Sequence, residues 1–453
     1  MFRITHPALA FVAVALCLAG PRSARAQTAC ITPHFSGATN QGSICLVAAL
    51  PDDADLSRAK TYADKRLAFH IWAWNTFLAL NTPVGPQRGV PAPGKTPADP
   101  GTRVWESYKT SAETYPHPPA IPTAWDAPVP PPSPPAGCPA SSGPLPVLSV
   151  ADKGDDPALS EVTQPMSGKF GHLIDQNGNL VYLDALTNRP SYEFVVNNKF
   201  YDADVQATAS QGQLLFPSGD RKTGAVPPID LKPAWKVLAG KDNAATFYHR
   251  QAYVIDPVTR KCTIETVGLV GFHITAKTVT APQWIWATFE HKDNAPDCAY
   301  PNGAASGCKP VSSQDHYSFY NPGCSACAIN QLPTDTASRT PAQVARIVAI
   351  PADVKSVNTQ VAALLKGSVW ENYVLVDAQF PQSPDLLYGN PAPIALANST
   401  LETFNQGASP ATQTSSCLGC HFLAAPAGRS AGSTFSDFDW QMGKAKSYAG
   451  KTP

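Results

Sequence analysis

Residues 264–289 read IETVGLVGFHITAKTVTAPQWIWATF, two apolar runs joined by a short connection. The runs, Ile264–Thr275 and Trp284–Phe289, are rich in β-branched and aromatic residues, which favour strands. The connection over residues 277–282 ends in a proline and has the length of a loop between neighbouring antiparallel strands. This stretch therefore predicts an antiparallel strand pair within a β-rich domain.

More strands are expected on either side of this pair. Short runs of apolar, β-branched and aromatic residues between turn-forming residues predict them. One run follows Asn177-Gly178-Asn179, a sequence that favours a tight reversal of the chain. The expected strands are residues 180–183, 193–196, 251–255 and 369–376.

Helices are expected where apolar residues recur at helical spacing. The clearest case is residues 55–82, directly before Pro83, which stops a helix. Its apolar face comprises Leu67, His70, Ile71, Trp74, Phe77 and Leu78. Trp72 and Leu80 fall outside that face, so we expect the helix to be covered on more than one side. Weaker helical patterns occupy residues 341–349 and 354–365.

Residues 83–146 contain 19 prolines, a density that excludes a continuous helix or a central strand. We expect this segment to wrap the domain irregularly, with one short helix near residues 104–108. Together, the patterns predict an α+β fold, in which helices pack on a large, β-rich, antiparallel domain.

The first 26 residues have the pattern of a secretory signal peptide. A basic start at Arg3 precedes an apolar run over residues 8–19, and an A-x-A cleavage site ends at Ala26. The run is too short to span a bilayer, so no transmembrane segment is expected. The whole chain has 34 basic and 34 acidic residues, and the signal peptide removes three arginines, which leaves a net charge of −3. This balance argues against nucleic acid as a partner, and export indicates the periplasm.

The cysteines of the exported chain divide into two groups. Cys417 and Cys420 belong to a motif described below, and eight others remain after Cys17 is lost with the signal peptide. An even number of cysteines in an oxidising compartment predicts disulfide bonds. The expected pairs are Cys30–Cys45 and Cys298–Cys308, with Cys324–Cys327 as a further candidate.

The stretch Cys417-Leu418-Gly419-Cys420-His421 matches C-x-x-C-H, the attachment sequence of c-type haem. Two thiols at this spacing can each bond to one vinyl group of the same porphyrin, and the histidine that follows can ligate the iron from the proximal side. We therefore expect one covalently bound haem c, held by Cys417, Cys420 and His421. The alternatives are a structural disulfide and a four-cysteine zinc site that adds Cys324 and Cys327.

The motif also defines the expected domain organisation. A signal peptide covers residues 1–26, a β-rich exported domain covers residues 27–400, and a short helical haem-attachment segment covers residues 401–453. Only 32 residues follow His421, too few to enclose a haem, so the large domain is expected to cover the porphyrin.

The sixth ligand of the iron is open at this point. His273 and His291 lie in the two central strands, and Met442 follows the motif by 21 residues. His70 and Met166 are weaker candidates, and a vacant sixth position is the alternative. Residues expected to pack against the haem edge are Phe435, Phe438 and Trp440, with Arg429 as a partner for a propionate.

Several tryptophan-rich segments accompany the C-x-x-C-H motif. They are residues 72–81, 104–106 and 283–291, together with Gly271-Phe272-His273-Ile274. This combination resembles a little-characterised family of exported bacterial cytochrome c proteins with one haem motif. The resemblance spans most of the mature chain and implies a role only for Cys417, Cys420 and His421.

The expected function is one-electron transfer, with redox proteins or small-molecule electron donors and acceptors as partners. The alternative is a haem enzyme of peroxidase or oxygenase type, because the β-rich domain is far larger than a carrier requires. A haem-based ligand-binding or sensor module is the third possibility.

Overall fold

The structure is a computed structural model, which describes residues 29–47, 49–117, 119–127, 135–149, 172–301, 303, 307–324, 326–333, 339–384, 390–407, 409–412, 415–429 and 435–448. The expected signal peptide and Met166 lie outside the described residues.

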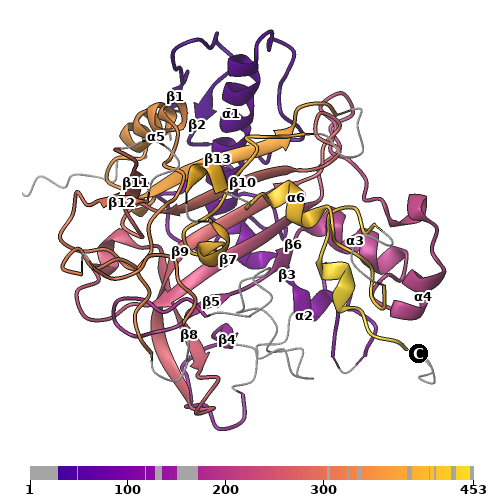
Figure 1. The fold of residues 1–453 in the computed structure, drawn as a ribbon. Helices are drawn as coiled ribbons and strands as arrows, with labels where there is room; N and C mark the ends of the chain where they lie inside the picture. The colour runs from indigo at the N-terminus through magenta and orange to yellow at the C-terminus, as the bar shows by residue number, and fades with distance from the viewer. Residues whose placement is uncertain are drawn as a thin grey trace, which may run out of the picture.

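The fold is built around a ten-stranded sheet, confirming the α+β class (Figure 1). Its main path runs in the order β14-β13-β10-β9-β7-β6-β3, while β5 pairs with β7 and β8 pairs with both β9 and β4. All pairs are antiparallel except β4–β8. The ten strands are β3 (Lys109–Thr110), β4 (Val147–Ser149), β5 (Val181–Leu183), β6 (Leu186–Thr187), β7 (Ile229–Val237), β8 (His249–Ile255), β9 (Cys262–Ala276), β10 (Ile285–His291), β13 (Tyr373–Pro381) and β14 (Pro391–Ala392). Two smaller sheets consist of β1 (Cys30–Ile31) with β2 (Ile44–Cys45), and β11 (Asp297–Ala299) with β12 (Lys309–Val311).

The predicted central pair is confirmed as β9 and β10. They are antiparallel, with Ile285 opposite Ala276 and Glu290 opposite Gly271. β9 is 15 residues long, and β7 pairs with most of its length on one side. On its other side β8 pairs with the first half and β10 with the second. The predicted strands at 180–183 and 251–255 are also confirmed, as β5 and β8.

The α-helices of the described residues are α1 (Tyr62–Asn81), α2 (Ser111–Thr114), α3 (Arg189–Asn197), α4 (Ala203–Thr208), α5 (Ala352–Leu364) and α6 (Cys417–His421). The predicted first helix is confirmed but begins at Tyr62, because Thr61 and Asp64 form a capping box. Sixteen of its 20 residues are buried, so it is covered on several sides, as expected. A short 3-10 helix over Val104–Ser107 matches the one expected in the proline-rich segment.

Three local predictions are corrected by the structure. Residues 193–196 belong to helix α3 rather than a strand, because the Asn188 side chain accepts a hydrogen bond from Ser191 N–H and a proline occupies the first turn. Residues 341–349 are irregular rather than helical, and Arg346 forms an isolated bridge with Asp297 of β11. Residues 369–376 begin as a 3-10 helix over Val369–Asn372 before β13 starts.

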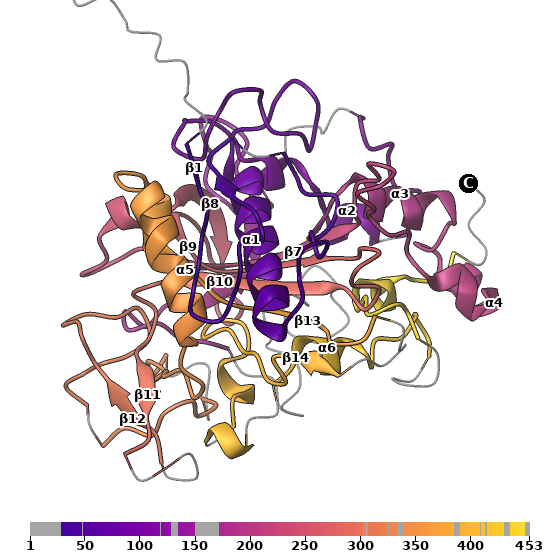
Figure 2. The same ribbon diagram turned by 90° about the horizontal axis from the view of Figure 1, so that it is seen from above.

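The two faces of the sheet are covered differently. On one face α1 packs on β9, β10 and β13, and Phe77 stacks on Phe289 with ring centroids 4.2 Å apart. Figure 2 shows α1 and α5 side by side, seen from above. The other face carries polar residues of β9 and β10, and the C-terminal segment, yellow in Figure 1, passes in front of the strands.

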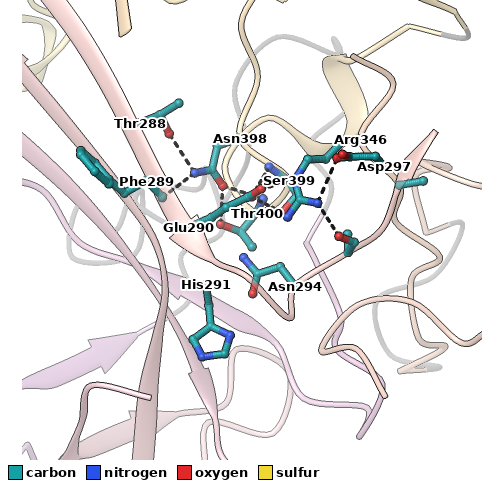
Figure 3. Close-up of polar contacts among 12 residues, drawn as sticks. Thr288, Phe289, Glu290, His291, Asn294, Asp297, Arg346, Asn398, Ser399 and Thr400 are labelled. Carbon is teal, nitrogen blue, oxygen red and sulfur yellow. Dashed lines mark hydrogen bonds and ion pairs between the residues drawn. The ribbon is translucent and has the colours of Figure 1, made fainter. Parts of the chain in front are cut away.

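A buried polar network attaches this C-terminal segment to the sheet (Figure 3). Glu290 of β10 is completely buried and pairs with the Arg346 guanidinium. Its second carboxylate oxygen accepts hydrogen bonds from Ser399 N–H, at 3.0 Å, and from the Ser399 hydroxyl. Asn398 donates to Thr288 Oγ1 at 2.8 Å and to the Phe289 carbonyl at 2.9 Å. Residues 398–399 are therefore held directly against the strand by hydrogen bonds to a buried charge.

Gly271 explains why the segment can approach so closely. A Cβ atom at this position would lie 2.2 Å from Thr400 Oγ1 and 3.2 Å from Asn398 Oδ1. Gly271 pairs with Glu290 across the β9–β10 ladder. A residue without a side chain is thus required beside the network.

Removing Arg346 should expose how strongly the fold depends on this network. Arg346→Met leaves the Glu290 carboxylate buried without its cation, so we expect a loss of about 3–5 kcal/mol in the free energy of unfolding. Urea titration followed by tryptophan fluorescence measures this loss.

Lys355→Met is the matched control. Lys355 pairs with Asp297, as Arg346 does, but its side chain is 52% exposed. We expect this control to lose less than about 1 kcal/mol. Equal effects of the two substitutions would show that the Glu290 pair has no special role.

Candidate haem-attachment site

The C-x-x-C-H motif forms helix α6 on the polar side of the sheet. Ser416 caps the helix, and its hydroxyl accepts a hydrogen bond from Gly419 N–H at 3.1 Å. Gln379 of β13 is buried, and its side-chain oxygen accepts from Leu418 N–H at 2.8 Å. The sheet thereby holds the start of the helix, which places Cys417 and Cys420 one turn apart.

Cys417 and Cys420 form no disulfide, whereas the other eight cysteines of the described chain are joined in four disulfides. Cys324 and Cys327 have the same C-x-x-C spacing, yet they form a disulfide. That bond removes the thiolates that a four-cysteine zinc site would need, so the zinc alternative is wrong.

All predicted disulfides are confirmed. Cys30–Cys45 joins β1 to β2, Cys298–Cys308 bridges the β11–β12 pair, and Cys324–Cys327 closes a short loop. Cys138–Cys262 completes the set and ties the proline-rich segment to the start of β9. Four disulfides are typical of a protein that folds in an oxidising compartment.

His421 is held in one orientation by the backbone and by a tryptophan. Its Nδ1 atom lies 2.8 Å from the Phe438 carbonyl oxygen, to which only a protonated Nδ1 can donate. The ring also packs on Trp286 of β10, with centroids 4.2 Å apart. Burial lowers the pKa of His421 to about 4, so the imidazole is neutral at pH 7. The Nε2 atom of this tautomer carries the lone pair that a metal requires.

The two thiols lie in surroundings that keep them protonated. Burial raises the pKa of Cys420 to about 11, and the negative charge of Glu402 adds to the effect. The pKa of Cys417 is raised well above its ordinary value for the same two reasons. Neither thiol is therefore a reactive thiolate in the folded protein.

This geometry fits a covalently attached haem. Two thiols outside any disulfide and a neutral imidazole with its Nδ1 atom already hydrogen-bonded are the groups that haem c requires. Cys417, Cys420 and His421 are each half-buried, between the sheet and solvent.

Among the candidates for the sixth ligand, His273 lies on the same face of the sheet as the motif. Its Nε2 atom is 2.8 Å from Glu402 Oε1, so the nitrogen is already engaged. Burial opposes ionisation of Glu402, but the charge of His273 and its hydrogen bond prevail and lower the pKa of Glu402. The charges of both residues reach His421 and contribute to its pKa.

His291 lies at the opposite end of β10 from Trp286. It is fully buried, stacks on Phe247 with centroids 4.0 Å apart, and its Nε2 atom is 3.0 Å from the Thr246 carbonyl oxygen. It lies five positions after Trp286, which is about 17 Å along a strand. The structure therefore does not bring His291 to the motif.

Met442 and His70 are both buried, and only Met442 lies near the motif. Met442 belongs to the apolar cluster that contains Trp286 and the motif residue Leu418, so it stays a candidate for the sixth ligand. His70 is on α1, across the sheet, with Nε2 3.1 Å from Asp377 Oδ1.

The aromatic residues expected near the haem gather beside the motif. Phe435 and Phe438 form an edge-to-face pair with centroids 4.8 Å apart, and Phe422 packs on both. The Trp440 side chain hydrogen-bonds to Cys420 and is 38% exposed. The Arg429 guanidinium donates to the Ala207 carbonyl.

Sequence reasoning missed three residues of this site, which are Gln379, Trp286 and Glu402. They come from β13, β10 and the segment before the motif, and no local pattern links them. Trp286 stood in a segment noted for its tryptophans, but nothing in that segment indicated contact with His421.

The comparisons with known proteins identify no relative. No protein-family model, no curated protein and no solved structure matches the chain. Of the helices within the described ranges, none has both the length and the apolar character needed to cross a bilayer. The site must therefore be interpreted from its own chemistry.

The buried His291 predicts a dependence of stability on pH. Burial lowers its pKa from 6.5 to about 4, so the unfolded chain binds a proton between these values that the folded chain does not. Stability contributed by neutral His291 is complete above pH 6.5 and is lost as the pH falls towards 4. We expect this loss to be about 3 kcal/mol by pH 4.

His291→Gln isolates this contribution, because a Gln amide can still donate to the Thr246 carbonyl but does not titrate. Urea unfolding at pH 7 and pH 4 should show wild type losing about 3 kcal/mol relative to the variant. A constant difference between the two proteins at both pH values would contradict the prediction.

Proposed function

We propose that the protein is an exported, periplasmic monohaem c-type cytochrome that transfers single electrons. The observation that carries this proposal is the contrast between the cysteines. Eight form disulfides, while the two in C-x-x-C-H form none and lie beside a histidine whose Nδ1 atom is already hydrogen-bonded.

Each residue of the motif has a defined part in this proposal. Cys417 and Cys420 would hold the porphyrin through two thioether links, and His421 Nε2 would ligate the iron. When bound, haem supplies a centre that gains and loses one electron. The Phe438 carbonyl fixes the tautomer and orientation of His421, and Trp286 limits rotation of its ring.

The surface near the motif suits electron exchange with a partner. Gly419, Leu423 and Trp440 are exposed, so a redox protein or small molecule can approach α6 directly. Residues 403–428 contain no Lys, Arg, Asp or Glu, so the motif lies in an uncharged stretch of the sequence.

Covalent retention of haem tests the proposal. The exported protein is denatured, washed with acid acetone and assayed as the pyridine haemochrome. Wild type should retain one haem per chain, and Cys417→Ala/Cys420→Ala should retain none. The control Cys324→Ser/Cys327→Ser removes a pair of identical spacing and should retain haem fully. A denatured and washed wild-type chain without haemochrome absorbance would contradict the proposal.

A second candidate is a haem enzyme or a ligand sensor with an open sixth position. One observation favours it: Nε2 of His273, the histidine candidate on the same face of the sheet as the motif, is already hydrogen-bonded to Glu402.

Carbon monoxide separates the two candidates. An electron carrier with six protein ligands should show a low-spin ferrous spectrum that carbon monoxide leaves unchanged. A shift of the Soret band on adding carbon monoxide would instead favour the enzyme or sensor. His273→Ala should alter the ferric spectrum only if His273 ligates the iron, and His291→Ala, far from the motif, is the control.

A further inference from the structure

The backbone that contacts His421 adopts an unfavourable conformation. Asp437 and Phe438 are consecutive residues with φ of 52° and 68°, in the left-handed region that residues with a Cβ atom rarely adopt. Two such residues in succession persist only where surrounding contacts hold them. The turn they form delivers the Phe438 carbonyl to His421 Nδ1.

The Asp437 side chain supplies those contacts. Its Oδ2 atom accepts from Lys277 Nζ at 2.5 Å and from Phe216 N–H at 2.8 Å. The side chains of Asp437 and Lys277 are only 2% and 7% exposed. Lys277 directly follows β9, so the sheet itself anchors the turn.

Two backbone hydrogen bonds also hold this turn. Ser436 N–H donates to the Ala424 carbonyl at 3.1 Å, and Asp439 N–H donates to the Ser436 carbonyl at 3.0 Å. The second of these bonds orients the peptide that carries the Phe438 carbonyl, because Asp439 N–H belongs to the same planar unit. The Lys277–Asp437 pair ties the first left-handed residue to the end of β9 and so holds the whole turn against the sheet.

We propose that Asp437 is a positioning residue, whose buried pair with Lys277 holds the left-handed turn so that the Phe438 carbonyl keeps His421 in the Nδ1–H form with Nε2 free for iron. The effect of Asp437 on bound haem rests on the proposed function. Its effect on the tautomer of His421 does not. A hydrogen bond to Nδ1–H makes the imidazole a stronger donor, which favours ferric over ferrous iron.

The first measurement is the reduction potential of the holoprotein. Asp437→Ala should keep its covalent haem but raise the potential, by about tenfold in the one-electron equilibrium or about 59 mV. Asp437→Asn keeps an oxygen acceptor for Lys277 and Phe216, so its potential should stay close to that of wild type.

The matched control is Asp242, which has the same kind of partners. Its carboxylate accepts from Lys236 Nζ at 2.7 Å and from Ala239 N–H at 2.9 Å, and its side chain is 1% exposed. Asp242→Ala should leave the potential unchanged, although it removes a comparable buried pair. Equal potentials in wild type, Asp437→Ala and Asp242→Ala would overturn the inference.

The second measurement requires no haem. In the exported Cys417→Ala/Cys420→Ala chain, ¹⁵N NMR of His421 should show the Nδ1–H tautomer, and adding Asp437→Ala should yield both tautomers. The same tautomer in both chains would overturn the inference even where the holoprotein carries haem. A tautomer change in a chain whose wild type retains no haem would support the role of Asp437 while rejecting the proposed function.

Discussion

The buried charge of Glu290 is the constraint on which the arrangement of the C-terminal segment depends. A carboxylate without solvent must be paired and hydrogen-bonded, and here Arg346 and Ser399 do both. Arg346 comes from the irregular residues 341–349, and Ser399 comes from the segment that leads to the motif. One charge on β10 thus fixes two distant parts of the chain on the same face of the sheet (Figure 3).

The site follows from this arrangement. Glu402, three residues after Ser399, meets His273, and α6 then begins against Gln379 of β13. Trp286 lies at the start of the strand that carries Glu290, where it contacts His421. The same strand therefore binds Ser399 through Glu290 near its end and contacts His421 through Trp286 near its start.

The long elements of the fold could be predicted from the sequence because their patterns extend over many residues. The apolar runs of β9 and β10 and the spacing in α1 are examples. Residues 193–196 look like a strand in isolation, and the helix that contains them is started by Asn188 and a proline upstream. Residues 341–349 carry apolar residues at helical spacing, which predicts a helix. Arg346 instead pairs with Glu290, which lies 56 positions away in the sequence, and no local pattern reveals that partner.

Only those residues of the candidate site that lie next to one another in the sequence could be predicted. Cys417, Cys420 and His421 form one motif, and the structure places them together on α6. The residues that orient them are scattered along the chain, because Gln379, Trp286 and Asp437 contact the motif or its neighbours through the tertiary fold. Periodicity reports which face a residue lies on, but it does not report which polar groups meet across elements.

The position of the C-terminal segment has a consequence for the order of assembly. Every described strand of the large sheet is complete by residue 392, and the segment covers that sheet from outside. Strand pairing can thus finish while the residues after 392 are still extended. During that interval the Cys417 and Cys420 thiols are open to solvent. When the segment packs on the sheet afterwards, it encloses any group that has become bonded to them.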